Sequence, residues 1–326
     1  MILSLGLDPI RIMEYVWPEM LLSIASSALC LCLYSSWGAS WAWVDLPAAP
    51  LSVFSFAIAF FVGLRSNASY QRWLAASTAW VGVTAACRNF ARLVLSFTDA
   101  RKGTDWLKCT EEVADKTKRE LINRQMAIAH ALRLSNRRQK DVEEWHGTLS
   151  QFLSKDDMKE LPAIGNTTVS WLMMKQGMAV HRAIAQSRLQ PFDQIALETT
   201  MGTLQQAIAA ATVIALIPQP AQYTQFTRFG IWVFILATPW CLIGSFNEVS
   251  HEALVVPVSM LLAFILAFID AVGRIVEQPM MNRPQDVPLS LFCWVIERDL
   301  RMALGDRSFG GDPPPPLTYR WVKYMM

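Results

Sequence analysis

The sequence predicts an all-α membrane protein, with four membrane helices continuous with a helical, water-facing domain. Apolar residues make up 53% of the chain and charged residues only 17%, below the roughly 25% that soluble domains carry. The charge is also unevenly placed, because it is concentrated between Arg65 and Arg188 and nearly absent from four apolar stretches. A net charge of +2 gives no basic footprint for nucleic acid. We therefore expect the lipid bilayer, and not nucleic acid, as a partner.

The first apolar stretch, 21–44, contains no charged residue and is long enough to cross a hydrocarbon core of roughly 30 Å. A cleavable signal peptide fits less well. Its apolar core would be too long, and Arg11 is followed by Glu14 and Glu19 rather than by more basic residues. The sequence predicts a membrane helix over 21–44.

The second apolar stretch, 50–64, is shorter than the roughly 20 residues that a spanning helix needs. However, nothing between Leu51 and Phe97 breaks a helix sharply, and Gly63 and Gly82 are tolerable interruptions. We therefore predict one long helix from 50 to about 98. Its first half, 50–64, lies in the membrane, and its second half leaves it.

The last two apolar stretches predict membrane helices over 228–246 and 253–273. Pro239 and Pro257 lie inside them as kinks that packed helices tolerate. The short connectors, 45–49 and 247–252, contain no Lys or Arg, whereas the middle of the chain holds most of them. By the positive-inside rule the middle and both termini face the cytosol, as expected of a multi-pass protein of the cell (inner) membrane.

The water-facing part is predicted to be helical over 99–222 and again over 285–305. No segment shows sustained strand alternation. The tail, 306–326, contains four consecutive prolines, which favour an extended chain.

Residues typical of catalysis or metal binding are sparse. The six cysteines form no CxxC pair, and the four histidines lack metal-ligand spacing. His130, on a helical face, is interpreted as a structural residue. No nucleophile elbow, phosphate-binding loop or dinucleotide fingerprint is present, so we expect no enzyme activity, no metal and no cofactor.

One motif identifies a family. The run from Gly63 to Trp73, GLRSNASYQRW, with the later CRNFAR, IPQPAQYT and EQP segments, resembles the signature of the bestrophin channel family in order and spacing. The tail after 305 is not covered by this resemblance. The motif residues are Arg65, Asn67, Tyr70, Arg72, Trp73, Arg88, Arg92, Pro218, Pro220 and Tyr223.

The resemblance implies a homopentameric ion channel with one axial pore, in which 1–305 form a single channel unit and 306–326 a separate tail. The second membrane helix would line a narrow neck. Phe56, Phe60 and Leu64 share one helix face at i, i+4 and i+8, and matching the motif places them on the pore side. A ring of these residues would gate by dewetting. The alternative is that they pack against another helix or lipid.

The sign of the permeating ion is less directly encoded, because the proposed neck contains no charged side chain. Aromatic rings have a positive edge and a negative face, so edges turned to the axis favour anions and faces favour cations. Relatives with an aromatic at the position of Phe60 conduct chloride and similar monovalent anions, whereas some bacterial relatives with an aliphatic residue there pass cations. Phe60 thus favours an anion channel. The alternatives are a monovalent cation channel and a membrane-anchored helical scaffold without ion flux.

Arg65 and Arg72 would add positive potential near the cytosolic side, unless they are paired within the protein or snorkel at the membrane edge, which is the interpretation favoured for Arg72. The resemblance also implies a second constriction at the cytosolic exit, placed at Phe192, with Ile195 as the alternative. Animal relatives bind calcium through an acidic cluster after the fourth membrane helix. Here that stretch retains Asp286 beside Arg283, and calcium needs roughly six to eight oxygen ligands. We therefore expect no calcium activation through this stretch.

Overall fold

The computed structural model describes residues 9–37, 47–98, 110–247, 251–306, 313, 317–319 and 322–324. Their contacts divide the chain into two compact units. The apolar unit comprises the described residues of Leu5–Arg72 and Pro218–Gln278. The polar unit comprises those of Trp73–Ile217 and Pro279–Met326. Each unit is described by itself.

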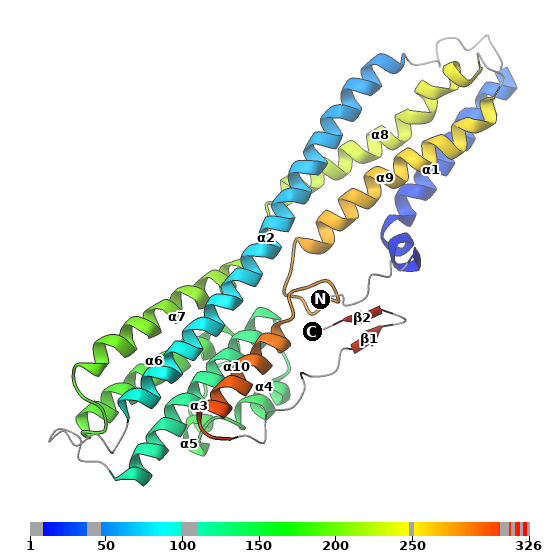
Figure 1. Cartoon of the computed structure of the whole chain (residues 1–326). Helices are drawn as coiled ribbons and strands as arrows, with labels where there is room; N and C mark the ends of the chain where they lie inside the picture. The colour runs from blue at the N-terminus through cyan, green and yellow to red at the C-terminus, as the bar shows by residue number, and fades with distance from the viewer. Residues whose placement is uncertain are drawn as a thin grey trace. The chain divides into compact units, whose positions relative to one another are not determined.

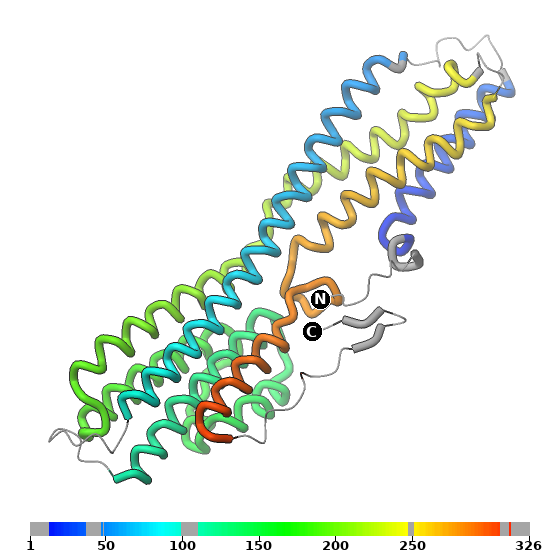
Figure 2. Tube along the Cα trace, viewed as in Figure 1, coloured from blue at the N-terminus to red at the C-terminus, as the bar shows by residue number. Residues whose placement is uncertain are grey.

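The apolar unit contains the helices that are long and apolar enough to cross a membrane (Figure 1). Four described helices meet this condition, which confirms the predicted number. α2 is one unbroken helix along the Cα trace, as predicted (Figure 2). The elements of this unit are α1 (Pro9–Trp37), the first part of α2 (Ala48–Phe97), α8 (Ala221–Asn247), the short 3-10 helix η2 (Glu252–Leu254) and α9 (Val255–Val276).

α1 begins well before the predicted boundary at residue 21. Its early part contains Glu19, which is buried and lies 3.9 Å from the guanidinium of Arg228 on α8. Because the helix continues through charged residues that pack on its neighbours, the apolar stretch alone underestimates its length. The predicted 38–44 portion lies outside the described residues.

The helices of the apolar unit are joined by packing and by a few hydroxyl contacts. α1 packs against both α8 and α9. The hydroxyl of Ser26 donates to the carbonyl of Leu236 at 2.9 Å, and the indole Nε1 of Trp240 donates to Ser26 Oγ at 3.2 Å. These contacts lie near Pro239, which occupies α8 without ending it. Side-chain hydroxyls between helices are a common stabilising device in membranes.

The polar unit is a bundle of helices around α3, which packs against α4, α6, α7 and α10. Figure 1 shows these helices side by side. The elements are the second part of α2, α3 (Glu111–Asn136), α4 (Val142–Leu149), α5 (Lys155–Lys159), α6 (Asn166–Ala185), α7 (Asp193–Leu216) and α10 (Leu289–Ala303).

α3 is the core helix of the polar unit. Between Leu121 and Leu134 most of its residues are buried, including Ile122, Met126 and Leu132. The charged residues of α3 lie mainly in its first half and extend to the buried Arg124, which pairs with Glu120 and Asp157. Glu111 is in the first turn, where an acidic side chain favours the helix dipole.

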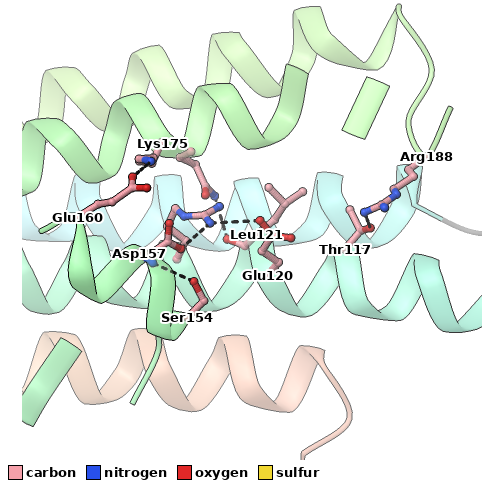
Figure 3. Close-up of polar contacts among 10 residues, drawn as sticks. Thr117, Glu120, Leu121, Ser154, Asp157, Glu160, Lys175 and Arg188 are labelled. Atoms are coloured by element: carbon pink, nitrogen blue, oxygen red, sulfur yellow. Dashed lines mark hydrogen bonds and ion pairs between the residues drawn. The ribbon is translucent and has the colours of Figure 1, made fainter. Parts of the chain in front are cut away.

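Polar contacts tie α3 to its neighbours (Figure 3). The amide of Gln176 on α6 donates to the carbonyl of Leu121 at 2.8 Å, and Arg188 donates to Thr117 Oγ1 at 3.1 Å. The short helix α5 is capped by Ser154, whose hydroxyl accepts from the backbone N–H of Asp157 at 3.1 Å. Such caps satisfy N–H groups that a helix start leaves unpaired.

The tail contains two short strands, β1 (Leu317–Tyr319) and β2 (Val322–Tyr324). They pair antiparallel, with Leu317 opposite Tyr324. This hairpin departs from the all-α prediction. Each strand has three residues, which is too few for an alternating sequence pattern to indicate it.

Candidate functional site

The first part of α2 has two apolar faces, one buried against other helices of the chain and the other exposed. Ile58 and Val62 are buried in an apolar cluster with residues of α8 and α9. The predicted neck residues lie on the other side, where Phe56 is 76% exposed, Phe60 57% and Leu64 45%. A contiguous exposed apolar surface of this kind faces lipid, another subunit or a pore. Within the described part of the chain these three side chains stay largely exposed, and the alternative that they pack against another helix, of a neighbouring subunit, or against lipid stays open.

The aromatic rings near the neck contact one another by their edges. Phe60 and Phe61 are T-shaped, with ring centroids 6.1 Å apart and planes at 70°. Phe61 makes a similar contact with Phe226 of α8 at 5.7 Å. Such edge-to-face pairs are favoured by the ring quadrupole. The pair therefore restricts the orientation of Phe60.

Arg65, one residue beyond the predicted neck residues, is buried inside the protein. Its guanidinium Nη1 lies 2.5 Å from Asp270 Oδ1 on α9, and Nη2 lies 3.3 Å from Glu277 Oε2. Arg65 and Asp270 are each 3% exposed, and Arg274 Nε also lies 2.9 Å from Asp270 Oδ2. The charge of Arg65 is thus neutralised within the apolar unit.

α2 and α9 approach each other closely beside this ion pair. A Cβ placed at Gly273 would lie 3.1 Å from Ser66 Oγ and 3.5 Å from its Cα. Any larger residue would require the Ser66 hydroxyl to shift, so the glycine favours this close approach of α9 to α2. The close contact and the ion pair together fix the segment of α2 directly below the neck residues.

The remaining motif residues of the apolar unit differ in exposure. Asn67 and Tyr70 are exposed, whereas Arg72 is partly buried. Pro220 starts α8, with the backbone N–H of Tyr223 donating to its carbonyl at 3.1 Å. Pro218 and the side chain of Tyr223 are exposed. The motif residues of this unit therefore include both exposed and partly buried positions.

Three motif residues belong to the polar unit and have structural contacts there. Trp73 donates its indole N–H to the carbonyl of Gln285 at 3.2 Å. Arg88 forms an ion pair with Asp299 on α10, with Nε 2.7 Å from Oδ2. Arg92 donates to Asn89 Oδ1 on its own helix, at 2.9 Å from Nη2. The contacts of Trp73 and Arg88 join α2 to other parts of the bundle, whereas that of Arg92 stays within α2.

The two candidates for the cytosolic constriction lie at the start of α7. Phe192 immediately precedes the helix and Ile195 lies in its first turn. Asp193 Oδ2 accepts from the backbone N–H of Gln190 at 2.9 Å, which fixes this turn. Both apolar side chains are largely exposed, so the exposure of the single chain does not choose between them.

Asp286 is hydrogen-bonded to the backbone of its own loop. Its Oδ2 accepts from the backbone N–H of Arg283 at 3.0 Å, and its backbone N–H donates to the carbonyl of Arg283. The side chain is buried, and burial raises its pKa even though the N–H groups of Arg283 and Met281 oppose the shift. Among the described residues, no group of three or more His, Cys, Asp or Glu could hold a metal ion.

His130 lies on α3 with its ring packed inside the polar unit, as a structural residue would. Its ring stacks on Phe152 at 4.9 Å, and Nε2 lies 3.3 Å from Glu297 Oε2. Burial lowers the pKa of His130, although Glu297 acts in the opposite direction. Burial alone would raise the pKa of Glu297, but His130 and Arg301 bring it below its usual value. Glu297 thus joins α10 to α3 as an anion.

Sequence reasoning missed Asp270 and Glu277 as the partners of Arg65. A signal existed, because Asp270 is an acidic residue inside an otherwise apolar stretch. An ionisable residue at such a position is expected to pair within the bundle. What the sequence lacked was the register that brings α9 beside α2.

Residues 9–302 match the family described as bacterial/fungal bestrophin protein. Among curated proteins, the chain is 27% identical over 254 residues to a voltage-dependent anion channel-forming protein, YneE, of Escherichia coli, covering 77% of this chain and 75% of that one. It is 24% identical over 273 residues to the protein of the same name in Salmonella typhi, covering 83% and 82%.

Solved structures show the same fold. A bacterial bestrophin homologue from Klebsiella pneumoniae superposes with a TM-score of 0.76 at 20% identity, covering 89% of this chain and 99% of that one. Another structure of that homologue gives a TM-score of 0.77, covering 90% and 98%. The helical architecture with four apolar helices is therefore shared across low sequence identity.

Proposed function

Because this chain belongs to the bestrophin family, we propose that it is a homopentameric channel that passively conducts chloride and similar monovalent anions. Residues 1–305 would form one channel unit per subunit, in the cell (inner) membrane with both termini in the cytosol. The names of the relatives, which describe channels for anions, support this proposal.

The observation that carries the proposal is the exposed apolar face of α2. Phe56, Phe60 and Leu64 lie on the side of α2 opposite Ile58 and Val62, which the rest of the chain covers. Five such faces around an axis would form a hydrophobic neck that excludes water unless it widens. Small residues on the flanks of this face would let neighbouring α2 helices approach closely.

The aromatic residue at position 60 favours anions over cations, provided that its ring edge faces the axis. The edge contact of Phe60 with Phe61 limits the orientations that the Phe60 ring can take. If Phe60 turns its edge to the axis, the partial positive charge of the ring hydrogens would favour an anion. The neck would then select by ring quadrupole, because Arg65 is paired with Asp270. A cytosolic constriction at Phe192, or alternatively Ile195, would lie further along the same pathway.

The test is a reversal-potential measurement on purified protein in planar bilayers under a potassium chloride gradient. The sign of the potential separates an anion channel, a cation channel and a protein without ion flux. Phe60→Ile should change both selectivity and conductance. The matched control is Phe229→Ile, which alters an exposed phenylalanine on α8 and should change neither. If Phe60→Ile behaves like the control, the neck assignment is wrong.

A further inference from the structure

We propose that Asn67 and Gln71 form a neutral polar ring at the exit of the hydrophobic neck, and that this ring sets the discrimination among anions. The proposal rests on the channel function proposed above. It assigns a selectivity role to two amide side chains rather than to the neighbouring arginines.

The helical register of α2 places the two amides on the side of the helix that carries the neck residues. At about 100° per residue, Asn67 and Gln71 fall within about 20° of the mean direction of Phe56, Phe60 and Leu64. Both lie in the same unbroken helix as the neck residues. Asn67 is one turn beyond Leu64 and Gln71 is two turns beyond it. Any axis that the neck residues face is therefore faced next by these two amides.

The two arginines of this part of α2 lie away from the side that carries the neck residues. Arg65 lies about 140° around the helix from that direction, and Arg72 about 120°. Arg65 is also buried against Asp270 and Glu277. No charged side chain therefore lies on the neck-facing side of α2 within the apolar unit. An ion that leaves the neck meets amides before it meets a formal charge.

The side chains of Asn67 and Gln71 are available to form hydrogen bonds with a permeating ion. Both are exposed, and within the described part of the chain neither has a hydrogen-bond partner. Each amide carries two N–H donors and one carbonyl acceptor. Five copies at each level would offer an ion that has lost water in the neck a new set of hydrogen bonds. A chloride ion accepts the N–H groups, and a cation would instead require the carbonyl oxygens.

This arrangement discriminates by hydration. A strongly hydrated anion such as chloride loses more on entering an apolar neck than a weakly hydrated one such as thiocyanate. N–H donors placed directly at the exit compensate part of the lost hydration free energy, and they compensate more for chloride than for thiocyanate. Removing the donors should therefore make chloride relatively less permeant.

The test compares thiocyanate and chloride permeability in planar bilayers for wild type, Asn67→Leu and Asn67→Asp. Asn67→Leu keeps the side-chain size but extends the apolar surface. It should raise the thiocyanate-to-chloride permeability ratio by about threefold to tenfold, the scale of one lost hydrogen bond. Asn67→Asp would place five carboxylates at the exit and should lower the anion-to-cation permeability ratio.

The matched control is Ala68→Asp, which places the same charge one residue along, on an exposed position about 100° around the helix. It should change the permeability ratios much less than Asn67→Asp. The proposal is overturned if Asn67→Leu and Asn67→Asp leave both ratios unchanged, or if Ala68→Asp acts as strongly as Asn67→Asp. A wild-type protein that passes no anions would instead reject the proposed function itself.

Discussion

The buried ion pair between Arg65 and Asp270 makes a quantitative prediction about stability. The two side chains are almost fully enclosed, and their closest atoms are 2.5 Å apart. Removing one partner of a buried pair typically costs about 3–5 kcal/mol, because the other charge stays buried without compensation. Asp270→Ala should destabilise the protein by this amount. It removes the partner of both Arg65 and Arg274, whose Nε lies 2.9 Å from the same carboxylate.

Two comparisons separate this effect from simple loss of a side chain. Glu277→Ala removes the longer and less enclosed contact of Arg65, at 3.3 Å, and should cost about 1 kcal/mol. The double substitution Arg65→Met with Asp270→Leu removes both charges and should recover much of the loss. The control is Asp156→Ala, which breaks the fully solvent-exposed contact with Lys159 and should have no measurable effect.

The assay is reversible unfolding of the purified protein in detergent, followed by tryptophan fluorescence with increasing denaturant. The reasoning predicts the order Asp270→Ala, Glu277→Ala, Asp156→Ala, from largest loss to smallest. An Asp270→Ala protein as stable as the Asp156→Ala control would refute the view that this charge pair is enclosed. A double variant less stable than Asp270→Ala alone would refute the argument from uncompensated charge.

Three further predictions concern residues of the polar unit. Because burial lowers the pKa of His130 below its ordinary 6.5, the unfolded chain binds a proton more readily. Stability should therefore fall as the pH drops from about 6.5 towards the lowered value, and His130→Gln should remove this dependence in pH-resolved unfolding. Burial raises the pKa of Cys293 to about 12, so mass spectrometry should find it unmodified by maleimide at neutral pH until the protein is denatured. Calcium should not increase the current, and an activation abolished by Asp286→Ala would contradict this.

The sequence predicted the membrane helices well because their signal is local. A long apolar stretch without charge has few other stable states, so α2 and α9 lie within a few residues of the stretches that hydropathy indicates, whereas α8 begins at Ala221, before the predicted residue 228. The start of α1 was missed because Glu14 and Glu19 end the apolar run. Glu19 is accommodated by a helix that lies far away in the sequence, and that contact leaves no local trace.

The candidate site was predictable only in part. The helical spacing of Phe56, Phe60 and Leu64 placed them on one face, and among the residues that the structure describes this face stays largely exposed. The environment of Arg65 depends instead on the register of α9 against α2, which Gly273 permits. That register follows from tertiary packing, and no pattern within either helix specifies it. The role of these residues in conduction remains a prediction for the bilayer experiments.

The packing of α1 has a consequence for how the protein is made. Ser26 bonds to a carbonyl 210 positions later in the chain, and α1 packs on α8 and α9, the last membrane helices to be synthesised. Translation proceeds from the N-terminus. The polar groups of α1 therefore lack their hydrogen-bond partners on α8 until that helix has been synthesised. We expect ribosome-bound chains that end before α8 to leave α1 open to membrane proteases or insertion chaperones. Chains that extend beyond α9 should be protected, and equal protection at both lengths would show that α1 finds another partner first.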